Sequence, residues 1–187
     1  MMRLFIAMPL SHEIEQSLAR IIFDLKQTRA NVKWVAAQNI HLTLKFLGDT
    51  DENKVNAIKE IIAQTSQKYS AVDSEINKVG AFPNLRRPRV IWAGLAGGIE
   101  TLATISRDLE EQLEPIGFEK EKRAFKSHLT LGRVKSDSGL NDLAEAIEKY
   151  EMAPEKIRFD KIILFKSTLT PSGPIYDKLF ESGLKSE

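Results

Sequence analysis

One tetrapeptide occurs twice in the chain: His41-Leu42-Thr43-Leu44 returns as His128-Leu129-Thr130-Leu131. The two copies are 128 − 41 = 87 residues apart. Side chains alternate between the two faces of a β-strand. In each copy the histidine and the threonine therefore share one face, and the two leucines share the other. The leucines suit a core, whereas the polar face offers an imidazole and a hydroxyl to a ligand.

The segments around the tetrapeptides follow the same order at the same offset. Each half reads as a strand, an amphipathic helix, a strand with the tetrapeptide, a second helix and a further strand. The predicted strands cover residues 3–8, 32–35, 40–47, 74–79, 89–95, 127–134, 157–166 and 175–180. Helices are predicted after Ser11, after Asp49 or Thr50, and near Leu102 and Leu140. Several connections are too short for parallel crossovers, so we expect mainly antiparallel sheets in an α+β fold.

We expect a single domain, residues 1–187, of two pseudo-symmetric lobes, with repeat copies of about 1–87 and 88–187. A unit that occurs twice indicates a duplicated two-lobe domain rather than a solenoid, which needs at least three repeats. If the lobes face each other, the cleft between them receives both histidines and both threonines. The third histidine, His12, lacks the tetrapeptide and is expected on the surface.

The composition excludes several classes of protein. Hydrophobic residues make up 42% and charged residues 28%, which is not the composition of a disordered chain. The net charge of +1 provides no global attraction to nucleic acid or membrane, so an anionic ligand needs a local patch. The absence of cysteine excludes disulfides, zinc–thiolate sites and a cysteine nucleophile. No apolar run approaches the ~18 residues of a membrane span, and we expect a cytoplasmic protein without a membrane partner.

Two imidazoles on opposite sides of a reacting group can act as general base and general acid, because the pKa of histidine lies near neutrality. Two hydroxyls can hydrogen-bond the non-bridging oxygens of a phosphate held between them. In-line displacement at phosphorus has an entering and a leaving oxygen on opposite sides. This chemistry requires no metal and no cofactor, and neither tetrapeptide contains Asp or Glu. A single His-x-Thr usually lies on a solvated strand face, but the second copy favours the catalytic interpretation.

The paired tetrapeptides and their surroundings resemble the 2H phosphoesterase superfamily. The stretch WVAAQNIHLTLKFLG at residues 34–48 is similar to its RNA 2′,3′-cyclic phosphodiesterase branch, also called 2′-5′ RNA ligase. Residues 3–7, 88–94 and 169–176 are similar to the same branch, so the resemblance covers essentially the whole chain. It implies a bilobal fold in which two antiparallel sheets line a central cleft, with helices outside.

The resemblance also implies an activity and roles for residues. The activity is hydrolysis of a terminal RNA 2′,3′-cyclic phosphate to a 2′-phosphomonoester, without metal or cofactor, on substrates such as tRNA fragments. His41 corresponds to the proton donor and His128 to the proton acceptor, while Thr43 and Thr130 correspond to the phosphate-binding hydroxyls. Run in reverse with a 5′-hydroxyl in place of water, the same groups would form a 2′-5′ linkage. We expect a monomer.

Three further residues are candidates for substrate binding. Strand alternation places Lys45 on the face of His41, where it can meet phosphate. Phe46 fits either a core position or a platform for a base. Arg133 falls on the face of Leu129 unless Gly132 permits a bulge that turns it toward the cleft. Two basic clusters fit either an RNA backbone or a solvated loop: Arg86, Arg87 and Arg89, and Lys120, Lys122, Arg123 and Lys126.

Two alternatives remain open on the sequence. One is a phosphodiesterase acting on small cyclic nucleotides or on an ADP-ribose cyclic phosphate. The other is a non-catalytic RNA- or nucleotide-binding module, against which the intact pair of histidines argues.

Overall fold

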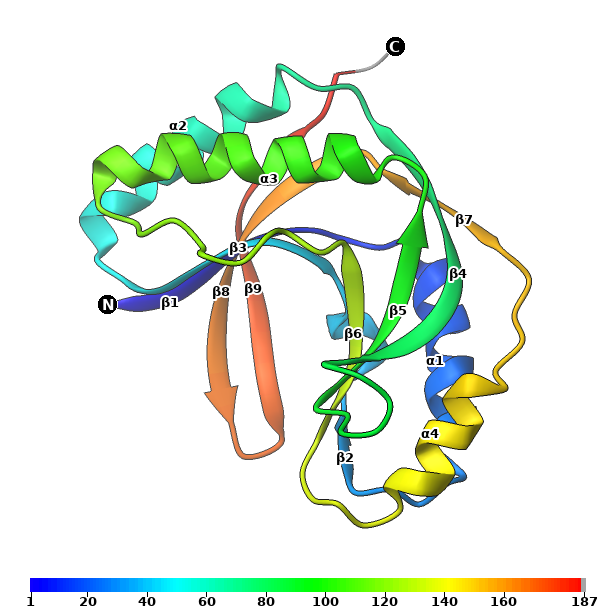
Figure 1. Cartoon of the computed structure of the whole chain (residues 1–187). Coiled ribbons are helices and arrows are strands. Elements are labelled where there is room, and N and C mark those ends of the chain that lie inside the picture. Colours follow the sequence, from blue (N-terminus) through cyan, green and yellow to red (C-terminus); the bar gives the residue numbers. More distant parts are fainter. Residues whose placement is uncertain (186–187) are drawn as a thin grey trace.

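The computed structural model describes residues 1–185 and contains two β-sheets with helices on their outer faces (Figure 1). Sheet A has the strand order β3-β1-β8-β9, and sheet B has the order β2-β6-β5-β4-β7. Neighbouring strands within both sheets are antiparallel. The predicted α+β class with two antiparallel sheets is confirmed.

The elements have the following bounds. Sheet A consists of β1 (Met2–Met8), β3 (Leu42–Thr50), β8 (Lys161–Thr170) and β9 (Gly173–Gly183). Sheet B consists of β2 (Val32–Trp34), β4 (Val72–Phe82), β5 (Val90–Ala96), β6 (His128–Val134) and β7 (Glu155–Phe159). The α-helices are α1 (His12–Lys26), α2 (Val55–Ser66), α3 (Ile99–Leu113) and α4 (Leu140–Glu148). Short 3-10 helices span Ala37–Asn39, Glu52–Lys54 and Glu114–Ile116.

The offset of 87 residues reappears in the elements. Helix α3 begins and ends 87 residues after α1, because 99 − 12 and 113 − 26 both equal 87. The sheets nevertheless do not follow the boundary between the copies. Strand β4, from the first half of the chain, pairs with β5 in sheet B, and β8, from the second half, pairs with β1 in sheet A. Each sheet is therefore built from both halves, which ties the two parts of the molecule together.

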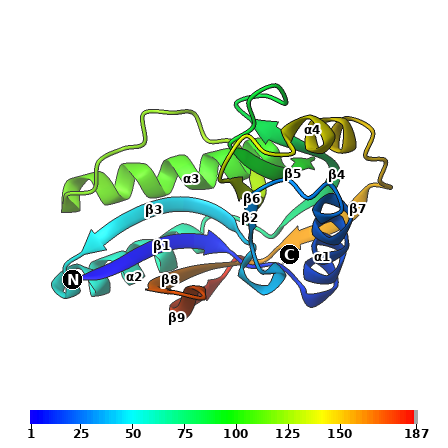
Figure 2. The ribbon, with the colours of Figure 1, turned by 90° about the horizontal axis from the view of Figure 1, so that it is seen from below.

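The helices are exchanged in the same way. Helices α2 and α3 pack on sheet A, whereas α1 and α4 lie side by side against sheet B. Seen from below, α1 and α4 gather at one end of the molecule (Figure 2). The predicted cap of α1 is present, since the Ser11 hydroxyl accepts a hydrogen bond from the backbone N–H of Ile14. Both pairs of tetrapeptide leucines are buried in the core, as alternation predicts.

Several strand bounds differ from the prediction, since β4 and β9 extend beyond the predicted residues 74–79 and 175–180. Two further differences lie at Asp160 and at Gly48. The single strand predicted at 157–166 is wrong, because Asp160 separates β7 of sheet B from β8 of sheet A. The strand with the first tetrapeptide continues to Thr50 rather than ending at Gly48, which adopts a φ of 68° within it. Within residues 1–185, no helix has the length and apolar character needed to cross a bilayer.

Candidate active site

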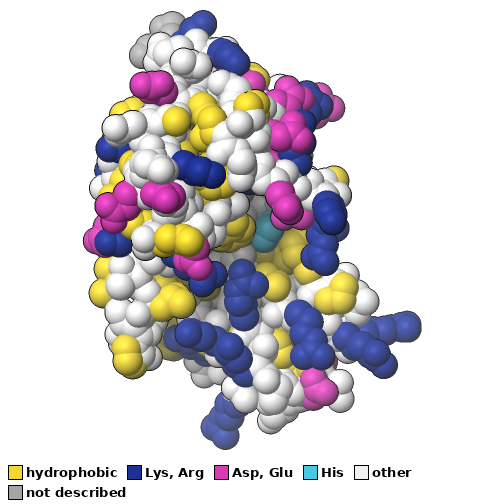
Figure 3. Space-filling view, turned by 90° about the vertical axis from the view of Figure 1, so that its left-hand side faces the viewer, with side chains coloured by type: hydrophobic (Ala, Val, Ile, Leu, Met, Phe, Trp, Pro, Cys, Tyr) yellow, Lys and Arg dark blue, Asp and Glu magenta, His cyan; other side chains and the backbone are white. Residues whose placement is uncertain are grey.

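The polar faces of the two tetrapeptides meet in one cleft between the sheets. His41 and Thr43 reach it from the β3 side, and His128 and Thr130 reach it from β6. The cleft has a volume of about 730 Å³ and is open to solvent. Figure 3 shows a histidine side chain at the bottom of a hollow in the surface. The structure thus brings together the four residues that the sequence singled out.

The two imidazoles are fixed by the same backbone contact. Nδ1 of His41 lies 2.8 Å from the carbonyl oxygen of Asn39, and Nδ1 of His128 lies 2.6 Å from that of Lys126. In both cases the carbonyl belongs to the residue two positions earlier. Since a carbonyl oxygen only accepts, each Nδ1 carries the proton and donates it. Nε2 is then the nitrogen that takes up or releases a proton in each ring.

Aromatic side chains surround the imidazole of His41. Its ring stacks on Phe5 at a centroid distance of 4.8 Å and meets the edge of Tyr176 at 5.5 Å. Phe165 stacks on Phe5 at 5.2 Å, and its ring centre lies 6.3 Å from that of His41. Burial among these rings disfavours the charged imidazolium and lowers the pKa of His41 to about 4, although the bond to Asn39 opposes the shift. In the free protein His41 is therefore neutral at pH 7.

His128 lies in a more cationic setting. Its ring meets the edge of Phe82 at 5.1 Å. Burial lowers its pKa below the usual 6.5, the hydrogen bond to Lys126 opposes this, and the charges of Arg133 and Lys126 lower it further. The two imidazoles thus hold the same backbone contact in different surroundings, one aromatic and one positively charged.

Matching β-bulges follow the two histidines. In β3, Ala7 pairs with Thr43 and Ile6 with Lys45, which leaves Leu44 without a partner. In β6, Trp92 pairs with Thr130 and Ile91 with Gly132, which leaves Leu131 without one. The two bulged positions are again 87 residues apart. Each bulge shifts the alternation of side chains by one residue, so the next cleft-facing position comes three residues after the threonine.

Phe46 and Arg133 occupy those two equivalent positions, since 133 − 46 = 87. Both line the cleft. The Phe46 side chain is 66% exposed, so the core alternative for this residue is wrong. For Arg133 the second alternative applies: a bulge is present and turns the side chain to the face of Thr130, where its charge acts on His128. The same backbone device therefore presents an aromatic ring from one sheet and a cation from the other.

Lys45 does not lie where alternation predicted. The bulge at Leu44 directs it to the opposite face, where it is 7% exposed beneath α3. Its Nζ lies 2.6 Å from Oε2 of Glu110 and 2.5 Å from the carbonyl oxygen of Glu119. The expectation that Lys45 shares the face of His41 is thus wrong. Instead, Lys45 in β3 contacts both α3, through Glu110, and the segment before β6, through Glu119.

The lining of the cleft is positively charged although the whole protein is almost neutral. Four cations contribute to it, Arg3, Lys33, Arg133 and Lys135, and the described lining contains no Asp or Glu. Lysine and arginine side chains gather around and below the hollow in Figure 3. A local field of this sign favours an anionic ligand in the cleft. Neither Thr43 nor Thr130 has a side-chain hydrogen bond within the described part of the chain, so both hydroxyls remain available.

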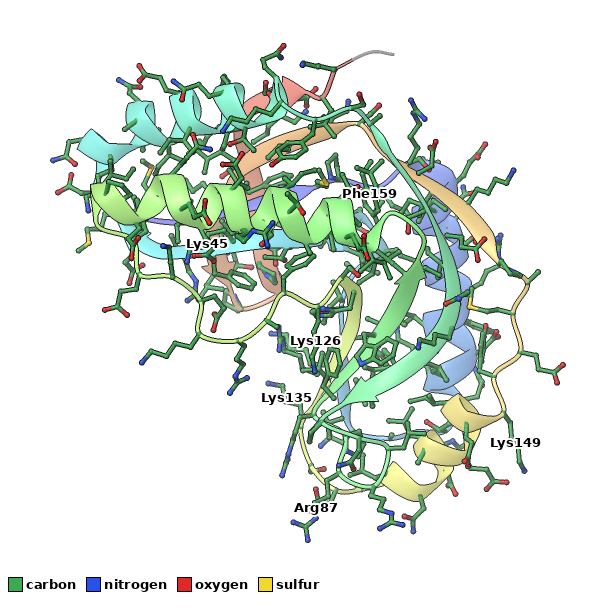
Figure 4. All side chains as sticks on the ribbon, turned by 45° about the horizontal axis from the view of Figure 1, so that its top comes forward. Lys45, Arg87, Lys126, Lys135, Lys149 and Phe159 are labelled. Carbon is green, nitrogen blue, oxygen red and sulfur yellow. The ribbon has the colours of Figure 1, made fainter. Side chains whose placement is uncertain are left out.

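The two basic clusters of the sequence lie outside the lining of this cleft. In the loop after β4, the backbone N–H groups of Arg86 and Arg87 donate to the Asn84 side chain. Both arginines are exposed. In the second cluster, Lys120 pairs with Glu114. Lys126, Lys135 and Arg87 lie along one edge of the molecule (Figure 4).

Several cleft residues were not identified from the sequence. Arg3, Lys33 and Lys135 belong to strands or strand ends far apart in the chain, and only the pairing of sheet B brings Lys33 opposite Arg133. In the sequence, Phe5 is indistinguishable from an ordinary apolar strand residue. One signal for Arg3 and Phe5 was available. They are two residues apart in β1, so their side chains share one face of that strand, which pairs with β3.

Comparisons with known proteins agree with this geometry. The sequence model of the family described as LigT like Phosphoesterase matches residues 8–92 and 95–176. A protein of Methanothermobacter thermautotrophicus named RNA 2′,3′-cyclic phosphodiesterase is 37% identical, with 93% of this chain and 94% of the relative covered. One of the same name from Methanocaldococcus jannaschii is 36% identical over 96% of this chain and 99% of the relative.

Solved structures share the fold. TT0787 of Thermus thermophilus superposes with a TM-score of 0.83 at 24% identity, over 100% of both chains. E. coli LigT, crystallised with 3′-AMP, gives a TM-score of 0.78 at 23% identity over 99% of both chains. Together with the family match over most of the sequence, these similarities confirm the resemblance to the 2H phosphoesterases. The chain belongs to the family of LigT-like phosphoesterases.

Proposed function

We propose that the protein hydrolyses the 2′,3′-cyclic phosphate at the end of an RNA and leaves a 2′-phosphomonoester. The observation that carries the proposal is the pair of Nδ1–carbonyl hydrogen bonds at His41 and His128. They leave two reactive Nε2 atoms, one from each sheet, in a single cation-lined cleft. The names of the relatives, RNA 2′,3′-cyclic phosphodiesterase, support the substrate class.

In the proposed reaction, Thr43, Thr130 and Arg133 hold the non-bridging oxygens of the cyclic phosphate. Neutral Nε2 of His128 accepts a proton from a water molecule, whose oxygen forms the new bond to phosphorus. The bond between phosphorus and the 3′-oxygen breaks, and protonated Nε2 of His41 donates its proton to that oxygen. The products are a 3′-hydroxyl and a 2′-phosphate, and proton exchange with solvent restores both histidines.

The role of His41 as proton donor has a consequence for substrate binding. Its aromatic surroundings hold its pKa near 4 in the free protein, so the imidazole must gain a proton in the complex. A phosphate anion a short distance away raises the pKa of an imidazole, because it favours the charged form. Binding of the anionic substrate would therefore favour the protonated His41 that the reaction needs as its general acid.

Two further parts of the proposal concern ligation and metal. A 5′-hydroxyl in the place of the water molecule would form a 2′-5′ linkage at the same site. Hydrolysis without metal follows from the two-histidine chemistry and is tested by turnover in EDTA.

Phe46, exposed beside Thr43 on the cleft wall, is suited to stack on the terminal base. A cytoplasmic location, a monomeric state and tRNA fragments as substrates stay predictions.

The test is turnover of a dinucleotide that ends in a 2′,3′-cyclic phosphate, with and without EDTA, and with ³¹P NMR to identify the product. His41→Ala and His128→Ala are each expected to lower kcat by at least ~10²-fold, the usual contribution of a general acid or base. Circular dichroism should show both variants folded. Near-wild-type turnover in either variant, or a 3′-phosphate product, would refute the assignment. An ADP-ribose cyclic phosphate turned over in preference to the dinucleotide would favour the small-molecule alternative.

A further inference from the structure

A row of aromatic rings continues from His128 across the cleft-facing side of sheet B. The ring of Phe82, in β4, meets His128 at 5.1 Å, and the ring of Trp92, in β5, lies 5.1 Å beyond Phe82. Trp92 pairs directly with Thr130, so it shares the face on which the phosphate-binding hydroxyl lies. The row therefore starts at the proposed reaction centre and leads away from it, outside the lining of the cleft described above.

The indole of Trp92 lies over two glycines. A Cβ atom at Gly80 would come within 2.4 Å of the Trp92 ring, and one at Gly94 within 2.8 Å. Gly80 is the cross-strand partner of Trp92, and Gly94 is the next residue of β5 on the same face. Any larger residue at either position would displace the ring. The sequence thus leaves space for an aromatic surface that lies against the sheet.

Each ring of the row has an ammonium group above it. Nζ of Lys126 lies 5.0 Å from the centre of the Phe82 ring, and Nζ of Lys78 lies 5.8 Å from that of Trp92. Neither lysine forms an ion pair within residues 1–185. Aromatic platforms combined with unpaired cations are the arrangement that binds single-stranded nucleic acid, in which rings stack on bases and cations meet phosphates.

Trp92 also holds a polar group without a partner. Its Nε1–H is buried and is the one buried side-chain donor or acceptor in the described residues that lacks a hydrogen bond. Buried polar groups in folded proteins are almost always paired, and an unpaired donor is unfavourable. Nucleotides carry acceptor oxygens on the base, the ribose and the phosphate, and such an oxygen can accept the hydrogen bond that the indole lacks.

We infer that Lys78, Phe82, Trp92 and Lys126 form a binding track for the RNA strand that precedes the cyclic-phosphate nucleotide. This inference rests on the proposed function and assigns a surface for the nucleotides that precede the reacting one. The track is continuous with the reaction centre through the contact of Phe82 with His128, and its unpaired lysines complement the charge of the backbone. Arg87, exposed in the loop after β4, lies on the same edge of the molecule as Lys126 (Figure 4).

The test compares two substrates with the same terminal nucleoside 2′,3′-cyclic phosphate, the mononucleotide and a trinucleotide. Its readout is the ratio of kcat/KM for the trinucleotide to that for the mononucleotide. Trp92→Leu is expected to lower this ratio about tenfold, the order of a single base–aromatic stack. Trp92→Phe, which keeps a ring, should retain most of it. Lys78→Gln should lower the ratio and weaken its dependence on salt between about 50 and 200 mM, because fewer counterions are released.

Lys149→Gln is the matched control, since Lys149 lies at the far side of α4 and pairs with Glu145 (Figure 4). It should leave the ratio unchanged. If Trp92→Leu does not fold, the exposed Lys78 decides the question alone. An unchanged ratio in the folded variants would overturn the track, as would a wild-type protein that does not prefer the trinucleotide. A wild-type protein inactive on both substrates would instead refute the proposed function.

Discussion

The burial of His41 predicts that the stability of the protein falls between pH 7 and pH 5. In the native state the pKa of His41 is about 4, because the ring lies among Phe5, Phe165 and Tyr176, whereas an unfolded histidine titrates near 6.5. Between these values the unfolded chain binds a proton that the native protein does not. Stability contributed by the neutral ring is therefore present above pH 6.5 and is lost as the pH falls toward 4.

The magnitude follows from the two pKa values. At pH 7 both states are mostly neutral, and at pH 5 the unfolded state is almost fully protonated while the native state is not. The linkage relation then gives a loss of about 2 kcal/mol in the free energy of unfolding from this one group. His41→Asn removes the titration and keeps an N–H that can donate to the Asn39 carbonyl.

The assay is urea unfolding at pH 7, 6 and 5 for three proteins: the wild type, His41→Asn and the control His12→Asn. His12 is an exposed histidine on α1, outside the cleft. The difference in unfolding free energy between pH 7 and pH 5 should be about 2 kcal/mol smaller in His41→Asn than in the other two. Equal pH dependence in all three proteins would show that His41 titrates normally, and the argument from its aromatic surroundings would fail.

The remaining predictions concern catalysis and the buried ion pair. The pH dependence of kcat/KM reports the pKa values of the free enzyme, and those of both His41 and His128 are lowered. We therefore expect kcat/KM to be greatest below pH 6.5 and to decline above it, while kcat has its optimum at higher pH. A kcat/KM plateau from pH 7 to 9 would contradict this. Thr130→Val should raise KM or lower kcat without loss of thermal stability, and unchanged kinetics would show that this hydroxyl does not contact phosphate. Lys45→Met should destabilise the protein by about 3 kcal/mol, because the largely buried Glu110 carboxylate loses its counterion and keeps, among residues 1–185, only the backbone N–H of Glu121 as a partner. Lys45→Met/Glu110→Leu should recover most of that loss, and thermal denaturation of both variants decides it.

Local sequence patterns were sufficient to predict the class of fold and the faces on which the residues of the two tetrapeptides lie. Alternation in His-Leu-Thr-Leu placed the leucines in the core and the polar pair on the opposite face, since successive side chains of a regular strand point to opposite faces. The repeat offset of 87 residues predicted the order of elements, because equal patterns of apolar residues form equal elements. Their antiparallel pairing followed from short connections, which restrict how neighbouring strands can be joined.

The prediction from side-chain alternation failed where a β-bulge interrupts the strand. The bulges at Leu44 and Leu131 moved Lys45 out of the cleft and brought Phe46 and Arg133 into it. A bulge arises from the pairing of two strands. Gly132 signalled the one in β6, whereas no residue near Leu44 signalled the one in β3.

By itself, the sequence determined an α+β fold with two antiparallel sheets and two equivalent polar strand faces, because these follow from periodicity and spacing within short segments. Only the tertiary structure decided which strands share a sheet, and hence that β2 and β4 of the first half join sheet B while β8 and β9 of the second half join sheet A. It also decided the aromatic surroundings of His41, the cation-lined cleft and the row from His128 to Trp92. Each of these depends on contacts between residues far apart in the chain, whose free energy no local pattern encodes.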